Sequence, residues 1–337
     1  MLDRAPAPDA APIQSDEAAA IFARAFGDAG HVLLAVSGGA DSTALLILAA
    51  EWRDAPRLSV ATVNHGLRAE AVTEAADVAE LAGRLGLSHA ILAAPVSSKT
   101  RIEAAAREVR YSALREHADR IGADAIATAH TLDDQAETVL MRLAAGSGPA
   151  GLAAMRPETT RDGLRHFRPL LDVPKTRLVA SLAARGIGWS EDAMNADSRF
   201  ARPRLRTARD ALAAEGLTAR RLGRFATRMA RADAAIAHAV DQAADAHVAM
   251  DARDQLVVSA FAGLPEEILL RLLARLIAQA GGGELRLERL ERLIGRILGE
   301  PKGAATLAGA KIGWRRDAIV VSAAPPRRDG AATVPGV

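Results

Sequence analysis

The stretch from His31 to Ala50, HVLLAVSGGADSTALLILAA, constrains this 337-residue chain more than any other. Val32–Val36 is a short apolar run typical of a buried strand, and Thr43–Trp52 has the pattern of an apolar helix. The loop between them, Ser37-Gly38-Gly39-Ala40-Asp41-Ser42, holds two adjacent glycines. These remove the Cβ atoms that would keep an anion away from the backbone. The loop N–H groups and the first helical turn then point at one place, which suits a phosphate.

The chemistry of this loop differs from that of a Walker A loop. It lacks the Gly-Lys-Ser/Thr ending, and Asp41 stands where that motif carries a lysine. An acid beside phosphates is favourable when Mg²⁺ lies between them, and Ser37 and Ser42 can add hydroxyl donors. Two glycines alone predict a tight turn, and Asp-Ser is a common helix N-cap. The whole string resembles the pyrophosphate-binding loop of the N-type ATP pyrophosphatases, which cleave ATP between the α and β phosphates.

Strands and helices alternate through the first half of the chain. This order predicts an α/β fold with a doubly wound parallel sheet, in which ligands bind beyond the carboxyl ends of the strands. The Ser37 loop, the Asn64 segment and His130 all fall at such ends. The further predicted strands are Leu58–Val63, His89–Ala94 and Ala123–Thr128, and the helices are Glu70–Gly86, Arg101–Arg120 and Thr131–Ala145.

The second half predicts a mainly helical C-terminal domain that ends in a small β-hairpin. Its predicted elements are a strand at Phe167–Leu171, a helix at Pro174–Arg185, almost continuous helix from 207 to 250, a strand at Gln255–Ala260, helices at Pro265–Ala280 and Leu285–Leu298, and hairpin arms at Ala305–Lys311 and Ala318–Ser322. We therefore expect a flexible leader (1–25), an ATP pyrophosphatase domain (26–206), a helical linker (207–250), a C-terminal domain (251–323), to which the family resemblance given below assigns tRNA docking, and a disordered tail (324–337).

Composition narrows the chemistry. Lys and Arg number 43 against 41 Asp and Glu, so a nucleic-acid surface must come from local clusters. The chain has no cysteine, which excludes thiolate sulfur carriage, thiolate-bound iron–sulfur clusters and a cysteine nucleophile. We therefore expect the nucleophile to be a small molecule from solution. No apolar run reaches the ~18 residues of a membrane span, and the N-terminus lacks the apolar core of a signal peptide, which predicts a cytoplasmic protein.

The second informative string is Ala129–Thr138, AHTLDDQAET. On a helix, His130, Asp134 and Glu137 are related by i+4 and i+3 and share a face that can look toward the Ser37 loop. A histidine and two carboxylates there could hold Mg²⁺ and orient a substrate oxygen. The alternative is a solvated helix N-terminus whose acids favour the dipole, and for Asp133 this is the better interpretation.

Three further segments carry candidate cations. Arg68, after Asn64, and Arg110 would bring positive charge to a developing pyrophosphate, although such residues more often lie in a turn or on a solvated face. Ser190–Arg206 places acids before arginines. It suits either a charged linker or a pocket for a cationic amine followed by arginines that grip phosphate. The arginines between 220 and 231 form a solvated face or follow an RNA backbone.

Several strings in this order resemble the tRNA(Ile)-lysidine synthetase family of the PP-loop superfamily. They are SGGADS, VNHGLR, AAREVRY, TAHTLDDQAETVLMRLAAGSGPAGLAAM, RPLL and WSEDAMNADSRFARPRLR. The resemblance covers about Val32 to Arg206, with a weaker echo in TLAGAKIGWRRDAIVV. Two positions depart from the family pattern, because Pro203 stands where the family usually has Asn and Ala145 where an arginine is frequent.

The resemblance implies a reaction. ATP would adenylate the C2 carbonyl oxygen of the wobble cytidine of tRNA(Ile) with a CAU anticodon, and the amine of free L-lysine would attack C2 and expel AMP. By the same resemblance, Ser37–Ser42 bind ATP, Asp41 and Asp134 hold Mg²⁺, His130 and Glu137 lie at the reacting base and lysine, and Arg110 and Arg202 contact phosphate or the intermediate. The resemblance leaves the oligomeric state open, with a homodimer as one option.

Two other functions remain open from the sequence. The first is a different PP-loop tRNA-modifying enzyme, such as a thiolase fed by an external sulfur carrier, and the absence of cysteine counts against it. The second is a non-catalytic nucleotide- or RNA-binding protein. Asp41, Asp134 and Glu137 count against that one, because binding alone does not need three acids near phosphates.

Overall fold

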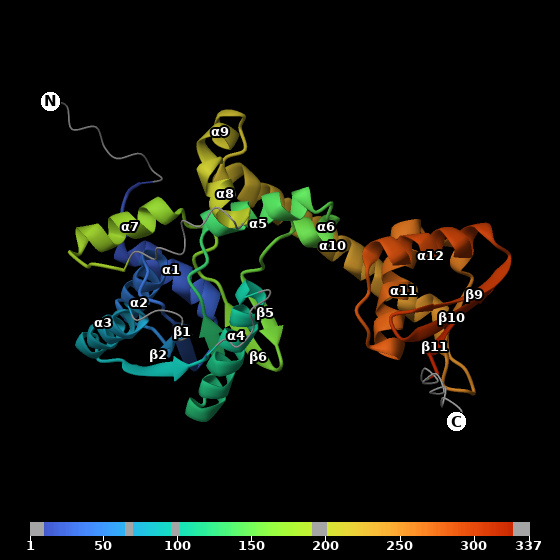
Figure 1. Ribbon diagram of the computed structural model, residues 1–337, viewed down its shortest axis with the longest axis horizontal. Helices are drawn as coiled ribbons and strands as arrows, with labels where there is room; N and C mark the ends of the chain where they lie inside the picture. Colours follow the sequence, from blue (N-terminus) through green and yellow to red (C-terminus); the bar gives the residue numbers. More distant parts are fainter. Residues whose placement is uncertain (1–9, 65–69, 96–101, 191–200, 326–337) are drawn as a thin grey trace, which may run out of the picture. The chain divides into compact units, whose positions relative to one another are not determined.

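The structure is a computed structural model that describes residues 10–64, 70–95, 102–190 and 201–325. The chain divides into two compact units, Met1–Ala230 and Arg231–Val337 (Figure 1). No helix in these described ranges is both long and apolar enough to cross a bilayer.

The first unit is built on a six-stranded sheet in the order β3-β2-β1-β4-β6-β5. All neighbouring strands are parallel except β5 and β6, which form an antiparallel pair at one edge. The predicted α/β fold with a parallel sheet is therefore confirmed. The strands are β1 (His31–Ala35), β2 (Arg57–Asn64), β3 (Ser88–Ala93), β4 (Ala125–Ala127), β5 (Glu158–Arg161) and β6 (Leu164–Phe167).

The strand predicted at Phe167–Leu171 is wrong, because β6 ends at Phe167. Strands β5 and β6 are joined by Asp162 and Gly163, whose φ angles are 50° and 82°. A two-residue hairpin loop with both φ values positive is typical of Asp-Gly. The Asp-Gly pair is therefore a local sequence signal for this hairpin. The strand predicted from the apolar residues after it did not take this signal into account.

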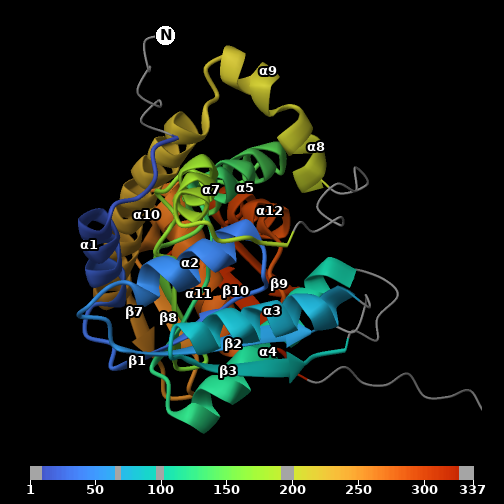
Figure 2. The same cartoon turned by 90° about the vertical axis from the view of Figure 1, so that its left-hand side faces the viewer.

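Helices cover both faces of this sheet (Figure 2). Along β1, Val32 and Leu34 pack into one core cluster with α2 and α7, whereas Leu33 packs into another with α4. This alternation follows from the two-residue period of a strand. The helices of this unit are α1 (Ser15–Phe26), α2 (Ala40–Ala50), α3 (Glu70–Arg84), α4 (Ile102–Ile121), α5 (Leu132–Ala144), α6 (Pro149–Leu152), α7 (Lys175–Ala184), α8 (Ala201–Thr207) and α9 (Arg209–Ala214).

The expected flexible leader, residues 1–25, is wrong for residues 15–25, because they belong to helix α1. Phe22 and Phe26, one helical turn apart, are completely buried. Their rings lie 6.5 and 6.3 Å from the ring of Trp52, and Phe26 lies 5.7 Å from Phe167. The i, i+4 spacing of two phenylalanines in an alanine-rich segment is the pattern of a helix that buries one face. Residues 1–9 lie outside the described ranges.

The second unit contains a five-stranded antiparallel sheet in the order β7-β8-β11-β10-β9. Leu290, Leu293, Ile294 and Ile297 are buried, as the helical spacing predicted. Its elements are α10 (Ala219–His247), which continues from the first unit, β7 (Val248–Met250), β8 (Leu256–Ser259), η2 (Phe261–Gly263), α11 (Glu266–Gly281), α12 (Leu287–Gly299), β9 (Lys302–Leu307), β10 (Ala310–Arg315) and β11 (Ala318–Ala323). The expected linker, 207–250, is thus divided between the two units.

The predicted hairpin is wrong in its first arm. Residues 305–311 span the end of β9, a turn and the start of β10, and β11 pairs with β10 rather than with β9. The turn consists of Ala308 and Gly309, whose φ angles are 48° and 79°. A Cβ added to Gly309 would lie 2.6 Å from the backbone oxygen of Gly281, so the turn approaches α11 more closely than any side chain allows.

We expect Phe22→Ala to destabilise the protein by about 3–5 kcal/mol, because it opens a cavity under α1. Chemical denaturation followed by circular dichroism measures the change. Arg24→Ala on the same helix is the matched control, since the Arg24 side chain is 70% exposed. Equal stability of the Phe22 and Arg24 variants would mean that α1 is not part of the folded core.

Candidate active site at the carboxyl edge of the parallel sheet

Strands β1 and β4 are neighbours at the centre of the sheet, although two strands and three helices separate them in the sequence. The chain leaves β1 toward β2 on one side and returns to β4 on the other. The carboxyl ends of two such strands frame the crevice in which doubly wound sheets bind ligands. The loop after β1 is Ser37–Ser42, and the segment after β4 contains His130, as the sequence predicted.

The two glycines of the loop serve different purposes. Gly38 has φ +90°, a conformation that a side chain would strain. Gly39 has an ordinary φ and is the N-cap of α2, and no side chain caps this helix. A Cβ on Gly39 would meet nothing closer than the Ser37 Oγ at 3.9 Å. The start of α2 therefore offers backbone N–H groups to open space, as an anion site requires.

Hydroxyl groups hold the loop from inside. The Ser42 hydroxyl donates to the Gly39 carbonyl at 3.0 Å and accepts the Ser37 backbone N–H at 3.1 Å. The Thr43 hydroxyl donates to the Gly38 carbonyl at 3.2 Å. In this structure the one proton of the Ser42 hydroxyl is used within the loop.

Asp41 is the acid of this loop, and its carboxylate is mostly buried. Its Oδ2 accepts a hydrogen bond from the Lys175 ammonium at 3.1 Å, whereas its buried Oδ1 has no hydrogen-bond partner in the described part of the chain. Burial raises the pKa of Asp41, Lys175 opposes this, and the negative charges of Asp134 and Asp133 add to the rise. A buried carboxylate oxygen without a partner, beside an anion site, suits a divalent cation.

Asp134 uses its two carboxylate oxygens for different contacts. Its Oδ2 accepts hydrogen bonds from the Thr131 backbone N–H at 2.9 Å and the Thr131 hydroxyl at 3.0 Å. Together with Thr131 as N-cap, it forms a capping box at the start of α5. The other oxygen, Oδ1, lies 3.8 Å from the Arg206 guanidinium. Thr131-x-x-Asp134 is a recognisable capping signal that the sequence reading had not used.

Glu137 lies one turn further along α5 and is nine-tenths buried. Its Oε1 accepts a hydrogen bond from the Arg206 Nε at 2.7 Å. Arg206 belongs to α8, so α8 brings one guanidinium to both site carboxylates of α5. Sequence reasoning singled out Arg202 in this run, and the side chain of Arg202 lies outside the described residues.

Asp133 was predicted to be a solvated first-turn acid, and this is wrong. It is 9% exposed, accepts the Lys175 backbone N–H at 2.7 Å and forms an ion pair with Arg209. It therefore ties the start of α5 to α7 and α9. The Lys175 side chain also contacts Asp41. The hydrogen bond between Asp133 and the Lys175 backbone therefore holds in place the residue that pairs with Asp41.

His130 does not lie on the helical face where the sequence predicted it. Thr131 is the N-cap of α5, so His130 belongs to the extended segment between β4 and the helix. Its Nδ1 lies 2.9 Å from the Thr128 hydroxyl. The edge of the sheet, rather than helical periodicity, brings it toward the site.

The remaining arginine candidates come from other segments of the chain. Arg110 lies on α4, where burial lowers the pKa of its guanidinium and Tyr111 and Arg107 also act on it. Arg68 and the side chain of Arg202 lie outside the described part of the chain. Pro203 lies in the first turn of α8, where its missing N–H would have no helical partner in any case.

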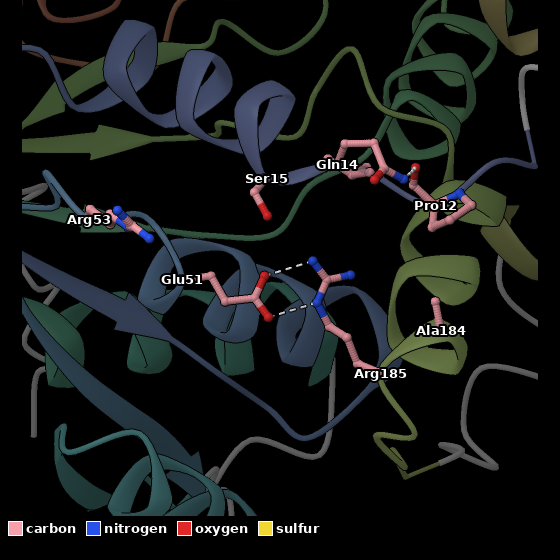
Figure 3. Close-up of a pocket in the computed structure, with 8 residues that line it drawn as sticks. Pro12, Gln14, Ser15, Glu51, Arg53, Ala184 and Arg185 are labelled. Carbon is pink, nitrogen blue, oxygen red and sulfur yellow. Dashed lines mark hydrogen bonds and ion pairs between the residues drawn. The ribbon is translucent and has the colours of Figure 1, made fainter.

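The described residues contain no group of three or more His, Asp and Glu placed to hold a metal ion. A cation at Asp41 and Asp134 would thus need phosphate oxygens as further ligands, as is usual for Mg²⁺. A pocket of about 530 Å³ lies elsewhere, at the far end of α2 from the loop (Figure 3). Its main charged pair, Glu51 and Arg185, is already satisfied by two hydrogen bonds of 2.7 and 2.6 Å.

Comparison with known proteins identifies the family. Residues 13–209 match the family described as the PP-loop domain. The tRNA(Ile)-lysidine synthase of Methylobacterium nodulans is 52% identical over 318 residues, which cover 90% of this chain and 93% of that protein. The synthase of Rhodopseudomonas palustris is 49% identical, with coverage of 88% and 91%. The chain belongs to the tRNA(Ile)-lysidine synthase family. It is therefore an ATP-using enzyme.

A solved structure agrees with the fold. The U34-tRNA thiolase of Methanococcus maripaludis, described with its [4Fe-4S] cluster, superposes with a TM-score of 0.54 and 17% identity, covering 64% of this chain and 78% of that one. This likeness concerns the fold alone. The present member of the lysidine synthase family has no cysteine with which to bind such a cluster.

We expect Asp41→Asn to stabilise the ligand-free protein by about 1 kcal/mol, the order of gain when a strained functional group is replaced. Because the pKa of Asp41 is raised in the folded state, its ionisation destabilises the fold as pH rises above the ordinary carboxyl range. The gain should therefore be largest near neutral pH and shrink on acidification.

Thermal unfolding without ATP or Mg²⁺, repeated across this pH range, measures the effect. Asp54→Asn is the control, because Asp54 is an exposed acid in a turn. A lower melting temperature for the Asp41 variant at neutral pH would contradict the assignment of Asp41 as a strained site residue.

Proposed function

We propose that this enzyme joins L-lysine to C2 of the wobble cytidine in tRNA(Ile) with a CAU anticodon, giving lysidine, AMP and pyrophosphate. The identity with tRNA(Ile)-lysidine synthases over most of both chains is the observation that carries the proposal. The site supports it, because the open start of α2 lies at the sheet edge where Asp41, Asp134 and Glu137 are gathered by Lys175 and Arg206.

The triphosphate binds along Ser37–Ser42, with its anionic oxygens at the backbone N–H groups that begin α2. Asp41 and Asp134 would hold Mg²⁺ together with phosphate oxygens, and the ion would supply positive charge for the leaving pyrophosphate. Lys175 contacts the other oxygen of Asp41, Oδ2, so its ammonium would lie beside the ion.

The reaction has two displacements. The C2 carbonyl oxygen of the cytidine attacks the α-phosphorus of ATP, and pyrophosphate leaves. The lysine amine then attacks C2 and loses a proton, and AMP leaves with the C2 oxygen. His130 and Glu137 lie at the reacting base and the amine. A cationic amine at Glu137 would share that carboxylate with Arg206, while Arg110 and Arg202 contact phosphate.

The decisive experiment is incubation of the full-length enzyme with ATP, Mg²⁺, radiolabelled lysine and transcripts of both tRNAs that carry a CAU anticodon. We expect label in the isoleucine tRNA and not in the methionine tRNA, with one AMP released per lysine incorporated. Incorporation of sulfur from an added carrier, or ATP binding without turnover, would replace the proposal with a thiolase or a binding protein.

Two variants separate the metal role of Asp134 from its capping role. Asp134→Asn keeps an oxygen for the Thr131 donors but removes the charge, and should lower pyrophosphate release on the order of a hundredfold. Thr131→Ala breaks the cap and keeps the carboxylate, and should cost about 1 kcal/mol of stability with most of the turnover retained. A larger loss of turnover in Thr131→Ala than in Asp134→Asn would reverse the assignment.

We further propose that α10 and the second unit dock the tRNA. We also propose that the enzyme acts in the cytoplasm, and a homodimer is an arrangement still to be tested. Arg224 and Arg228 are exposed and one turn apart on α10. Replacing both with Ala should weaken tRNA binding. The slope of the logarithm of the binding constant against the logarithm of the salt concentration should become less steep by about 0.7–0.9 for each lost phosphate contact. Filter binding across a salt series measures the slope, with Arg53→Ala, an exposed residue far along the chain, as control. An unchanged slope would make these arginines a solvated face.

A further inference from the structure

Beneath His130 lies a chain of polar side chains that the reaction above does not use. The Arg168 Nη2 lies 3.0 Å from the His166 Nδ1, the His166 Nε2 lies 2.8 Å from the Thr128 hydroxyl, and that hydroxyl lies 2.9 Å from the His130 Nδ1. The four residues come from the carboxyl ends of the neighbouring strands β4 and β6 and from the segments that follow them. Each link is within ordinary hydrogen-bond length.

Arg168 sets the direction of this chain. A guanidinium has only donors, so the His166 Nδ1 must accept. Arg168 cannot turn away easily, because it is 8% exposed and its Nη1 also donates to the Arg156 carbonyl at 2.9 Å and the Thr159 hydroxyl at 3.3 Å. The one proton of a neutral His166 is therefore on Nε2.

His166 stays neutral. Burial lowers its pKa to about 3, and the positive charges of Arg168 and neighbouring groups add to the effect. Its ring packs in an edge-type arrangement with the Tyr111 ring, with 5.2 Å between the two ring centroids, and this contact helps hold the imidazole plane. The protonated Nε2 then donates to the Thr128 hydroxyl oxygen.

Thr128 sets the direction of the next hydrogen bond, toward His130. Its hydroxyl accepts from His166 and has a single proton to give. Within the described residues, the one acceptor in reach of that proton is the His130 Nδ1. A hydroxyl that accepted from both histidines would leave its own proton without a partner at a half-buried position.

From this geometry we infer that Arg168, His166 and Thr128 form a positioning relay that fixes His130 with Nδ1 unprotonated and its proton on Nε2. The inference deepens the proposed function and rests on it for its chemical meaning. In the lysine ligation, His130 then acts as a hydrogen-bond donor to an anionic oxygen of the adenylated intermediate. Removal of the proton from the attacking amine falls to another group, and Glu137 is the carboxylate at hand.

The test is a nitrogen-15 spectrum of the full-length enzyme labelled at histidine. Long-range proton–nitrogen correlations distinguish the two tautomers of each ring, and His130→Gln identifies the signals of that residue. We expect His130 to show a protonated Nε2 and an unprotonated Nδ1. A protonated Nδ1 on His130 in the wild-type enzyme overturns the inference, whatever the activity assay shows.

Two variants of Thr128 test the relay in the reaction. Thr128→Val removes the hydroxyl with little change of shape, and should mix the His130 tautomers and lower kcat about tenfold with little change in the KM for ATP. Thr128→Ser restores a hydroxyl and should recover the wild-type tautomer and most of the lost rate. A wild-type spectrum and kcat in Thr128→Val would refute the relay.

The outcomes also separate this inference from the proposed function. If the Thr128→Val variant does not fold, the wild-type spectrum still decides the tautomer. If lysine ligation is absent while His130 shows the expected tautomer, the proposed function fails and the relay geometry stands.

Discussion

The pairing of β1 with β4 is the constraint on which the site depends. Val32, Leu33 and Leu34 lie in register with Ala125, Ile126 and Ala127, and this short parallel ladder sets the phosphate loop beside the segment of His130. The pairing is non-local, and buried apolar side chains on both faces hold it in place.

The groups gathered at this edge are held at some cost to stability. Among the described residues, one buried oxygen of Asp41 has no hydrogen-bond partner, and Asp134 divides its oxygens between a helix cap and Arg206. Lys175 and Arg206 supply the positive charge that lets such acids remain close together. Both cations lie on other elements, α7 and α8, so the acids are fixed by the surrounding fold while the loop stays open to phosphate. Below the site, the buried Arg168 orients His166 directly and orients His130 through His166 and the Thr128 hydroxyl.

Local structure could be predicted from the sequence wherever neighbouring residues along the chain decide it. The alternation of strands and helices, the glycine loop and the buried stripe of α12 follow from periodicity and from the freedom of Gly38, and all were predictable. Errors arose where a distant partner decides. Phe22 and Phe26 are buried because Trp52 and Phe167 pack against them, and Asp133 is buried because α7 and α9 contact it.

The sequence by itself determined the order of elements, the phosphate loop and the residue types available for chemistry, because each depends on contacts within a few positions along the chain. The tertiary structure alone decided which charges meet. Arg206 contacts Glu137, Lys175 faces Asp41, and Arg168 reaches His130 through His166 and Thr128. Such pairings depend on the packing of whole helices and strands, and electrostatic and hydrogen-bond partners are chosen at ångström precision that no spacing along the chain encodes.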